Sequence, residues 1–94
     1  MSDLASLRVI IHGCVQGVYF RDFTSRHAVE LGLIGYVRNL SGWKAVEVQA
    51  EGERGKLKKL IDYLKVGPLA AKVERAETNW SEYTGSYSDF SIRY

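Results

Sequence analysis

Hydrophobic and polar residues along this chain alternate in two different periods, and the two periods take turns. Residues 7–13 place an apolar side chain at every second position, which is the period of a strand with one buried face. Residues 21–31 instead carry an apolar stripe at every third or fourth position, as an amphipathic helix does. Gly32 follows and suits the left-handed residue that commonly ends a helix.

The remaining elements are predicted in the same way. Strands are expected over residues 33–39, 45–51 and 73–80, and a second amphipathic helix over residues 53–66. A polar stretch then turns the chain before a short last strand at residues 90–93.

The predicted strand at residues 45–51 shows the clearest alternation. Its apolar side chains face one way and its polar side chains face the other: Val46, Val48 and Ala50 against Glu47, Gln49 and Glu51. We therefore expect the glutamates to lie on a partly solvated face of the sheet.

The order of these elements is β-α-β-β-α-β, with a possible extra terminal strand. Two βαβ crossovers joined by a hairpin make the split βαβ, or ferredoxin-like, plan of the α+β class. Each helix has a single apolar stripe, so both helices are expected on one face of an antiparallel sheet. With no linker or repeat in the chain, residues 1–94 are interpreted as one domain. Because this fold hosts many functions, it does not identify one.

Composition narrows the function classes. The chain has 94 residues and a formal net charge of +2, which gives no reason to expect a nucleic-acid or membrane partner. Cys14 is the only cysteine, so an intrachain disulfide is impossible. The sequence contains no apolar run of about 20 residues and no signal peptide at its start. A cytoplasmic monomer is therefore expected.

The candidate chemistry lies between the first strand and the first helix, in the segment Gly13 to Arg21. Glycines allow a loop to turn successive N–H groups inward into a nest that binds anions. The start of the following helix adds free N–H groups and a positive dipole end, and Arg21 adds a guanidinium there. These features predict a site for a phosphate-sized anion. The alternative is an ordinary turn followed by a solvated arginine, and the segment lacks the patterns of a P-loop or a dinucleotide site.

The same segment also carries a family resemblance. Residues 13–21 read Gly-Cys-Val-Gln-Gly-Val-Tyr-Phe-Arg, and residues 35–39 read Gly-Tyr-Val-Arg-Asn. Both stretches resemble signature motifs of the acylphosphatases, and the resemblance extends over nearly the whole chain after residue 7. It implies hydrolysis of an acyl phosphate to a carboxylate and inorganic phosphate, with no cofactor and no metal.

The resemblance also implies a role for individual residues. Arg21 would bind the phosphoryl group, and Asn39 would position the attacking water. A cradle of backbone N–H groups would hold the phosphoryl oxygens, contributed by Cys14, Val15, Gln16, Gly17, Val18 and Tyr19. Independently of the resemblance, the carboxylate of the terminal residue, Tyr94, is expected to approach Arg21 and help to orient it.

Two other functions compete with hydrolysis. The first is a module of the same fold that binds phosphate or a small molecule without turnover. Binding alone would not require the amide of Asn39, so its presence favours hydrolysis. The second is RNA binding, which needs aromatic residues on the first and third strands. Residues 7–11 and 45–49 contain none, so the sequence does not favour RNA binding.

The sequence does not assign a side-chain role to Cys14 or Trp43. Cys14 has no evident base nearby and is expected to point away from the cradle, so a nucleophilic role is not favoured. Trp43 lies in the hairpin loop, where it would cover the loop or line the mouth of the site. This loop, at residues 40–44, is one residue longer than the family pattern, so its conformation is not predicted.

Overall fold

The computed structural model describes residues 3–42 and 44–94. Seven elements follow one another along the chain: β1 (Leu4–Cys14), α1 (Phe20–Glu30), β2 (Ile34–Asn39), β3 (Ala45–Glu53), α2 (Arg54–Val66), β4 (Lys72–Ser81) and β5 (Phe90–Arg93). The predicted order of elements is confirmed, including the extra terminal strand.

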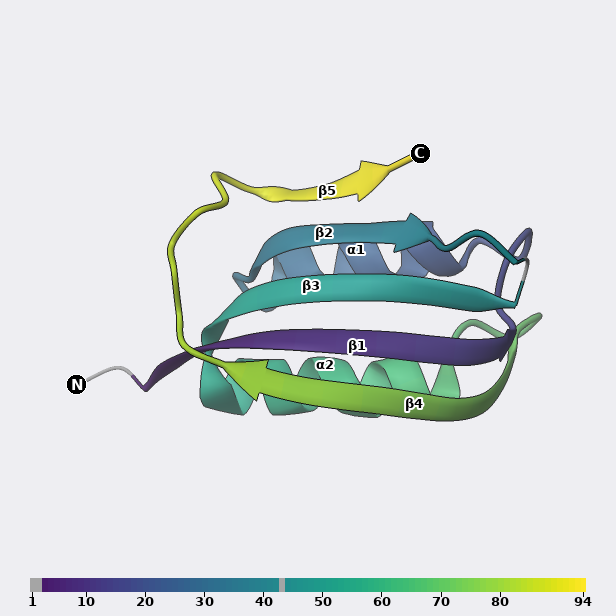
Figure 1. Cartoon of the computed structure of the whole chain (residues 1–94), viewed down its shortest axis with the longest axis horizontal. Coiled ribbons are helices and arrows are strands. Elements are labelled where there is room, and N and C mark those ends of the chain that lie inside the picture. Colours follow the sequence, from purple (N-terminus) through teal and green to yellow (C-terminus); the bar gives the residue numbers. More distant parts are fainter. Residues whose placement is uncertain (1–2, 43) are drawn as a thin grey trace.

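The five strands form one sheet in the order β4-β1-β3-β2-β5, and both helices cover the same face of it, as Figure 1 shows. Three of the neighbouring pairs are antiparallel, but β2 and β5 are parallel. The sheet is thus antiparallel as expected, except for the pairing of β2 with β5 at one edge. After β4, the chain passes along the end of the sheet to the opposite edge, so β5 runs antiparallel to β4 and parallel to β2 (Figure 1).

The core lies between the sheet and the two helices. The apolar faces predicted for the first and third strands are fully buried there: Leu7, Val9 and Ile11 with Val46, Val48 and Ala50. The helices contribute Phe20, Ala28, Leu57, Leu60 and Leu64 to the same cluster. Burying a large side chain of this kind contributes about 1.5–3 kcal/mol, so this layer supplies most of the folding free energy.

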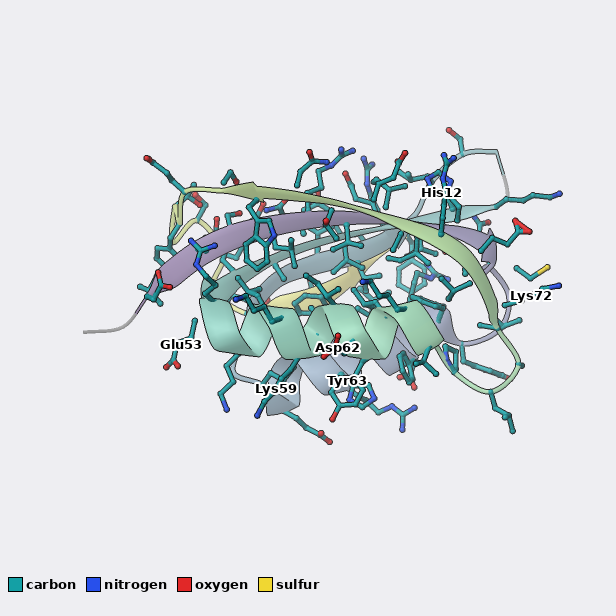
Figure 2. All side chains as sticks on the ribbon, turned by 90° about the horizontal axis from the view of Figure 1, so that it is seen from below. His12, Glu53, Lys59, Asp62, Tyr63 and Lys72 are labelled. Atoms are coloured by element: carbon teal, nitrogen blue, oxygen red, sulfur yellow. The ribbon has the colours of Figure 1, made fainter. Side chains whose placement is uncertain are left out.

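The outer face of α2 is polar, as its pattern of charges indicates. Lys59 and Asp62 are exposed, and Lys59 lies on the side of α2 away from the sheet in Figure 2, while Leu57, Leu60 and Leu64 are buried. Among the helices of residues 3–42 and 44–94, none is long and apolar enough to cross a bilayer.

The expected solvated side of β3 is buried at two positions. Glu47 is only 2% exposed, because Arg8 and Arg38 each donate a 2.6 Å hydrogen bond from Nε to its carboxylate. Tyr36 donates a third, 3.1 Å bond from its hydroxyl. Burial alone would raise the pKa of Glu47, but these hydrogen bonds outweigh it and hold the pKa below 4.5. The alternation in the sequence is therefore correct, but the inference of solvation is not.

Glu51 is also buried, at 1% exposure, by the connection between β4 and β5. Its carboxylate accepts bonds of 2.8 Å from the hydroxyl of Thr84 and from the N–H of Gly85. As at Glu47, hydrogen bonds to the charged form keep the pKa below its ordinary value despite burial. Glu51 thus anchors the segment that carries the chain across to β5.

Candidate active site

The site begins where the end of β1 leads into α1, at residues 13–19, which we call the cradle loop. Gly17 and Tyr19 both lie in the left-handed region, with φ of 72° and 62°. Tyr19 is the only non-glycine residue of residues 3–42 and 44–94 with a positive φ, and it directly precedes α1. Such a conformation costs a residue with a side chain about 1–2 kcal/mol. The left-handed conformation of Tyr19 at the start of α1 must therefore be stabilised by interactions elsewhere in the fold.

The N–H groups of the cradle loop divide into two sets. That of Val15 donates a 3.0 Å bond to the carbonyl of Gly13, and Cys14 lies in β1 opposite Lys72 of β4 with an exposed side chain. In contrast, no described residue accepts a hydrogen bond from the four N–H groups that follow, those of Gln16, Gly17, Val18 and Tyr19. The run of open donors thus starts after Val15 and leads directly into the helix N-terminus.

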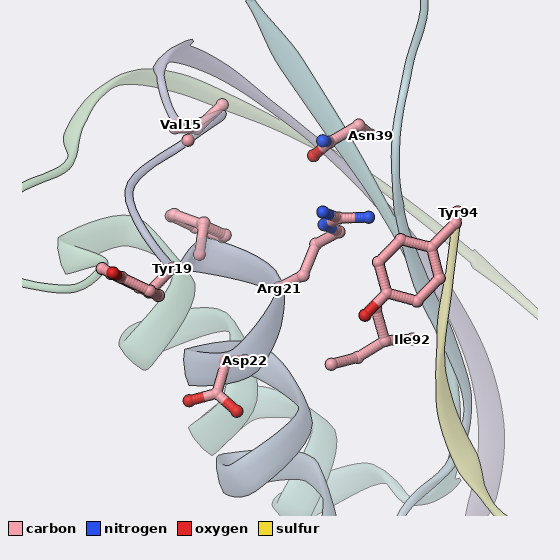
Figure 3. A pocket seen from close by; sticks show the side chains of 9 residues that line it. Val15, Tyr19, Arg21, Asp22, Asn39, Ile92 and Tyr94 are labelled. Carbon is pink, nitrogen blue, oxygen red and sulfur yellow. The ribbon is translucent and has the colours of Figure 1, made fainter.

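Two of these four residues, Gly17 and Tyr19, line a pocket of about 390 Å³, shown in Figure 3. Its walls come from the cradle loop, the first turn of α1, the end of β2 and strand β5. Arg21 and Asn39, predicted separately from the sequence, both line it. In Figure 3 the guanidinium of Arg21 and the amide of Asn39 reach into the same opening from different elements.

Arg21 is oriented by the end of the chain. Its Nη1 donates a 3.3 Å hydrogen bond to the carbonyl of Arg93, and its Cζ lies 4.6 Å from the centroid of the Tyr94 ring. The described residues show no ion pair between Arg21 and a terminal carboxylate, so that expectation is wrong. A carbonyl and an aromatic face take its place, because β5 brings the ring of Tyr94 against the guanidinium.

Asn39 is the last residue of β2, paired with Val46 of β3, and it is half-buried. Its side-chain amide makes no hydrogen bond to any residue of the described chain. An amide has one acceptor and two donors, so this group is able to hold a water molecule at the pocket.

Three lining residues had no site role predicted from the sequence: Phe20, Asp22 and Ile92. Ile92 of β5 forms part of the wall, and the alternation of the last strand was its only signal. Asp22 lies in the first turn of α1 and pairs with Arg26 at 3.1 Å. Trp43, predicted to cover the hairpin loop or to line the mouth of the site, is outside the described residues. Within the described ranges, no group of histidine, cysteine, aspartate and glutamate side chains is placed to hold a metal ion.

Known proteins of one family resemble this chain over nearly its whole length. The family model "Acylphosphatase" matches residues 7–92. An acylphosphatase of Dehalococcoides mccartyi (strain CBDB1) is 50% identical over 94% of this chain and 97% of its own length. An acylphosphatase of Pyrobaculum aerophilum is 41% identical over 96% of this chain and 95% of its own length.

Solved structures show the same architecture. The crystal structure of acylphosphatase from Bacillus subtilis superposes with a TM-score of 0.91 and 34% identity, covering 98% of this chain and all of that one. The structure of an acylphosphatase from Coxiella burnetii gives a TM-score of 0.84 and 40% identity, covering 97% of this chain and 94% of that one. A BLUF protein at 16% identity and a TM-score of 0.70 shares the fold alone.

Proposed function

The chain belongs to the acylphosphatase family and hydrolyses acyl phosphates, and from this premise we propose which of its residues carry out the reaction. The N–H groups of Gln16 to Tyr19 bind the phosphoryl oxygens together with the guanidinium of Arg21. The open donors of the cradle loop and the dipole of α1 supply a positive end for an anion. A guanidinium adds a fork of donors that matches two phosphoryl oxygens.

Asn39 positions the attacking water in this proposal. The water oxygen attacks phosphorus as the bond from phosphorus to the acyl oxygen breaks, and the bonding electron pair leaves with the carboxylate. One water proton passes to a phosphoryl oxygen, so the products are a carboxylate and inorganic phosphate. A carboxylate is a good leaving group, so the step needs no general acid and depends on positioning and charge stabilisation.

A neutral amide suits this role better than a carboxylate. A carboxylate base beside a doubly charged phosphoryl group would repel it, whereas the amide of Asn39 orients water without adding charge. Arg21 and the cradle then strengthen their hydrogen bonds as charge shifts in the transition state.

The observation that carries this assignment is the pocket itself. It brings Gly17 and Tyr19 of the cradle loop, Arg21 and Asn39 together around one cavity of about 390 Å³, although Asn39 comes from a separate part of the sequence. We also propose that the protein acts as a monomer. The single cysteine of the sequence is consistent with a cytoplasmic location, which we propose as well.

The test is metal-free hydrolysis of a simple acyl phosphate by alanine variants. Arg21→Ala should raise KM and lower kcat together, because binding and transition-state stabilisation are both lost. Asn39→Ala should lower kcat by about 100-fold or more with a smaller change in KM, as expected for a single positioning group.

Matched controls are available on the exposed surface. Arg26→Ala removes a guanidinium from α1, and Asn79→Ala removes an amide from β4, and neither residue lines the pocket. Both controls should retain wild-type kinetics. Near-normal hydrolysis by the Arg21 or Asn39 variant would refute the assignment of that residue.

A further inference from the structure

The side chain of Gln16 connects the cradle loop to the β2–β3 hairpin. Its Nε2 donates one hydrogen bond to the carbonyl of Leu40 and another to the carbonyl of Ala45, each at 2.8 Å. An amide nitrogen has two hydrogens, so both donors of this group are used. The backbone N–H of the same residue has no described acceptor.

The two carbonyls lie at the base of the hairpin, on either side of its loop. The N–H of Leu40 also donates a 3.0 Å bond to the carbonyl of Ala45. Gln16 therefore adds its two hydrogen bonds to a hairpin whose own strands are already hydrogen-bonded at this point. A second bond joins the same two segments, because the N–H of Gly13 donates to the carbonyl of Lys44 at 3.0 Å. The cradle loop and the hairpin are thus tied together at both ends of the hairpin loop.

Asn39 is the residue directly before Leu40. Its backbone therefore lies one peptide unit from a carbonyl that Gln16 holds. The Asn39 amide itself has no described partner that would fix its place relative to the cradle loop. Among the described residues, the Gln16 side chain forms the hydrogen-bonded connection from the cradle loop to Leu40, the residue next to this amide.

We propose that the side chain of Gln16 is a positioning residue for acyl phosphate hydrolysis, which sets the distance between the cradle and the water held by Asn39. This inference rests on the roles proposed above for the cradle and for Asn39. It assigns two separate tasks to one residue: the N–H binds the phosphoryl group, and the side chain aligns the hairpin. Only the second task is lost when the side chain is changed.

The test uses Gln16→Met, which has a similar length but no donors. Its kcat on a simple acyl phosphate should fall by about 10- to 100-fold, the cost of a misplacement on the order of 1 Å. KM and the inhibition constant of inorganic phosphate should stay within about threefold, because the N–H groups and Arg21 remain to bind the phosphoryl group. A merely structural role for Gln16 would not produce this split.

Gln49→Met is the matched control. Gln49 is a half-buried glutamine whose Nε2 donates a 2.7 Å bond to the Ser6 hydroxyl, and it does not line the pocket. Urea unfolding should show comparable losses of stability in the two variants, with kcat reduced only in Gln16→Met. Gln16→Asn keeps the amide but shortens its reach, so its kcat should fall between those of the wild type and Gln16→Met.

A double variant tests whether Gln16 acts through Asn39. In the Asn39→Ala background, Gln16→Met should lower kcat by less than about threefold further, because residues that act as a unit are not additive. A full loss in that background, or a wild-type kcat in Gln16→Met and Gln16→Asn, would overturn the inference. Normal kcat in Asn39→Ala alone would instead overturn the proposed function, so the two failures are distinguishable.

Discussion

The guanidinium of Arg21 lies against the ring of Tyr94, with 4.6 Å between Cζ and the ring centroid. The ring belongs to the residue after β5, and the carbonyl of Arg93 just before it accepts a hydrogen bond from the same guanidinium. The parallel edge strand therefore has a function in the site: it orients the cation that the first helix presents.

Removing the Tyr94 ring should weaken substrate capture. Tyr94→Leu should lower kcat/KM for an acyl phosphate by about two- to fivefold, since a cation–π contact at an exposed position contributes about 0.5–1 kcal/mol. Tyr94→Phe keeps the ring face and should retain wild-type kinetics.

Tyr83→Leu is the control for this prediction, because Tyr83 is an exposed tyrosine that does not line the pocket. It should leave kcat/KM unchanged. Equal activity of Tyr94→Leu and the wild type would show that the ring does not orient Arg21.

Glu47 should make folding stability depend on pH. The pKa of this buried carboxyl is held below 4.5 in the folded protein. The stability that it contributes is therefore present above the unfolded value and lost as the pH falls through the folded value. Glu47→Gln should lower the free energy of unfolding at pH 7 by about 1–3 kcal/mol, because bonds from Arg8 and Arg38 to a charged acceptor are replaced.

Urea unfolding from pH 7 to pH 3 measures this difference. The gap between the wild type and Glu47→Gln should narrow as the pH falls from the ordinary range of a glutamate carboxyl toward the lower folded pKa of Glu47, because the unfolded chain binds the proton first. Asp62→Asn removes an exposed carboxylate of α2 and should show no comparable loss at pH 7. A gap of constant size down to pH 3 would contradict the assigned role of the Glu47 charge.

Two glycines should respond to alanine in opposite directions. Gly35 of β2 has a φ of +136°, and an added Cβ would overlap the carbonyl oxygen of Gln49 on β3. Gly35→Ala should therefore lower the free energy of unfolding by about 3 kcal/mol or more. In α2, Gly55 has open space around it, so Gly55→Ala should raise stability by about 0.5–1 kcal/mol.

Chemical denaturation of both variants measures the two effects. If Gly35→Ala were as stable as Gly55→Ala, β2 would not approach β3 as closely as described. The close contact with Gln49 would then not explain why a glycine occupies position 35.

The sequence alone predicted much of the fold, because the periods of burial are local. The alternation in residues 7–13 and 45–51 and the stripe of residues 21–31 place each side chain on a face without knowledge of its partners. Part of the site could also be predicted from one continuous segment. A glycine-containing loop that leads into a helix indicates an anion site, and Arg21 lies at the start of that helix. Asn39 was identified by resemblance to a family motif and by the value of a neutral amide beside a phosphoryl group.

The tertiary structure decided what depends on residues far apart in the sequence. Glu47 and Glu51 follow a solvated pattern, yet both are buried, because Arg8, Arg38 and the connection around Thr84 reach them from other elements. The parallel pairing of β5, the contact of Tyr94 with Arg21 and the two bonds of Gln16 arise in the same way. A sequence pattern records whether a position favours burial, but the partner that makes burial of a charge or an amide favourable is fixed only when distant segments meet.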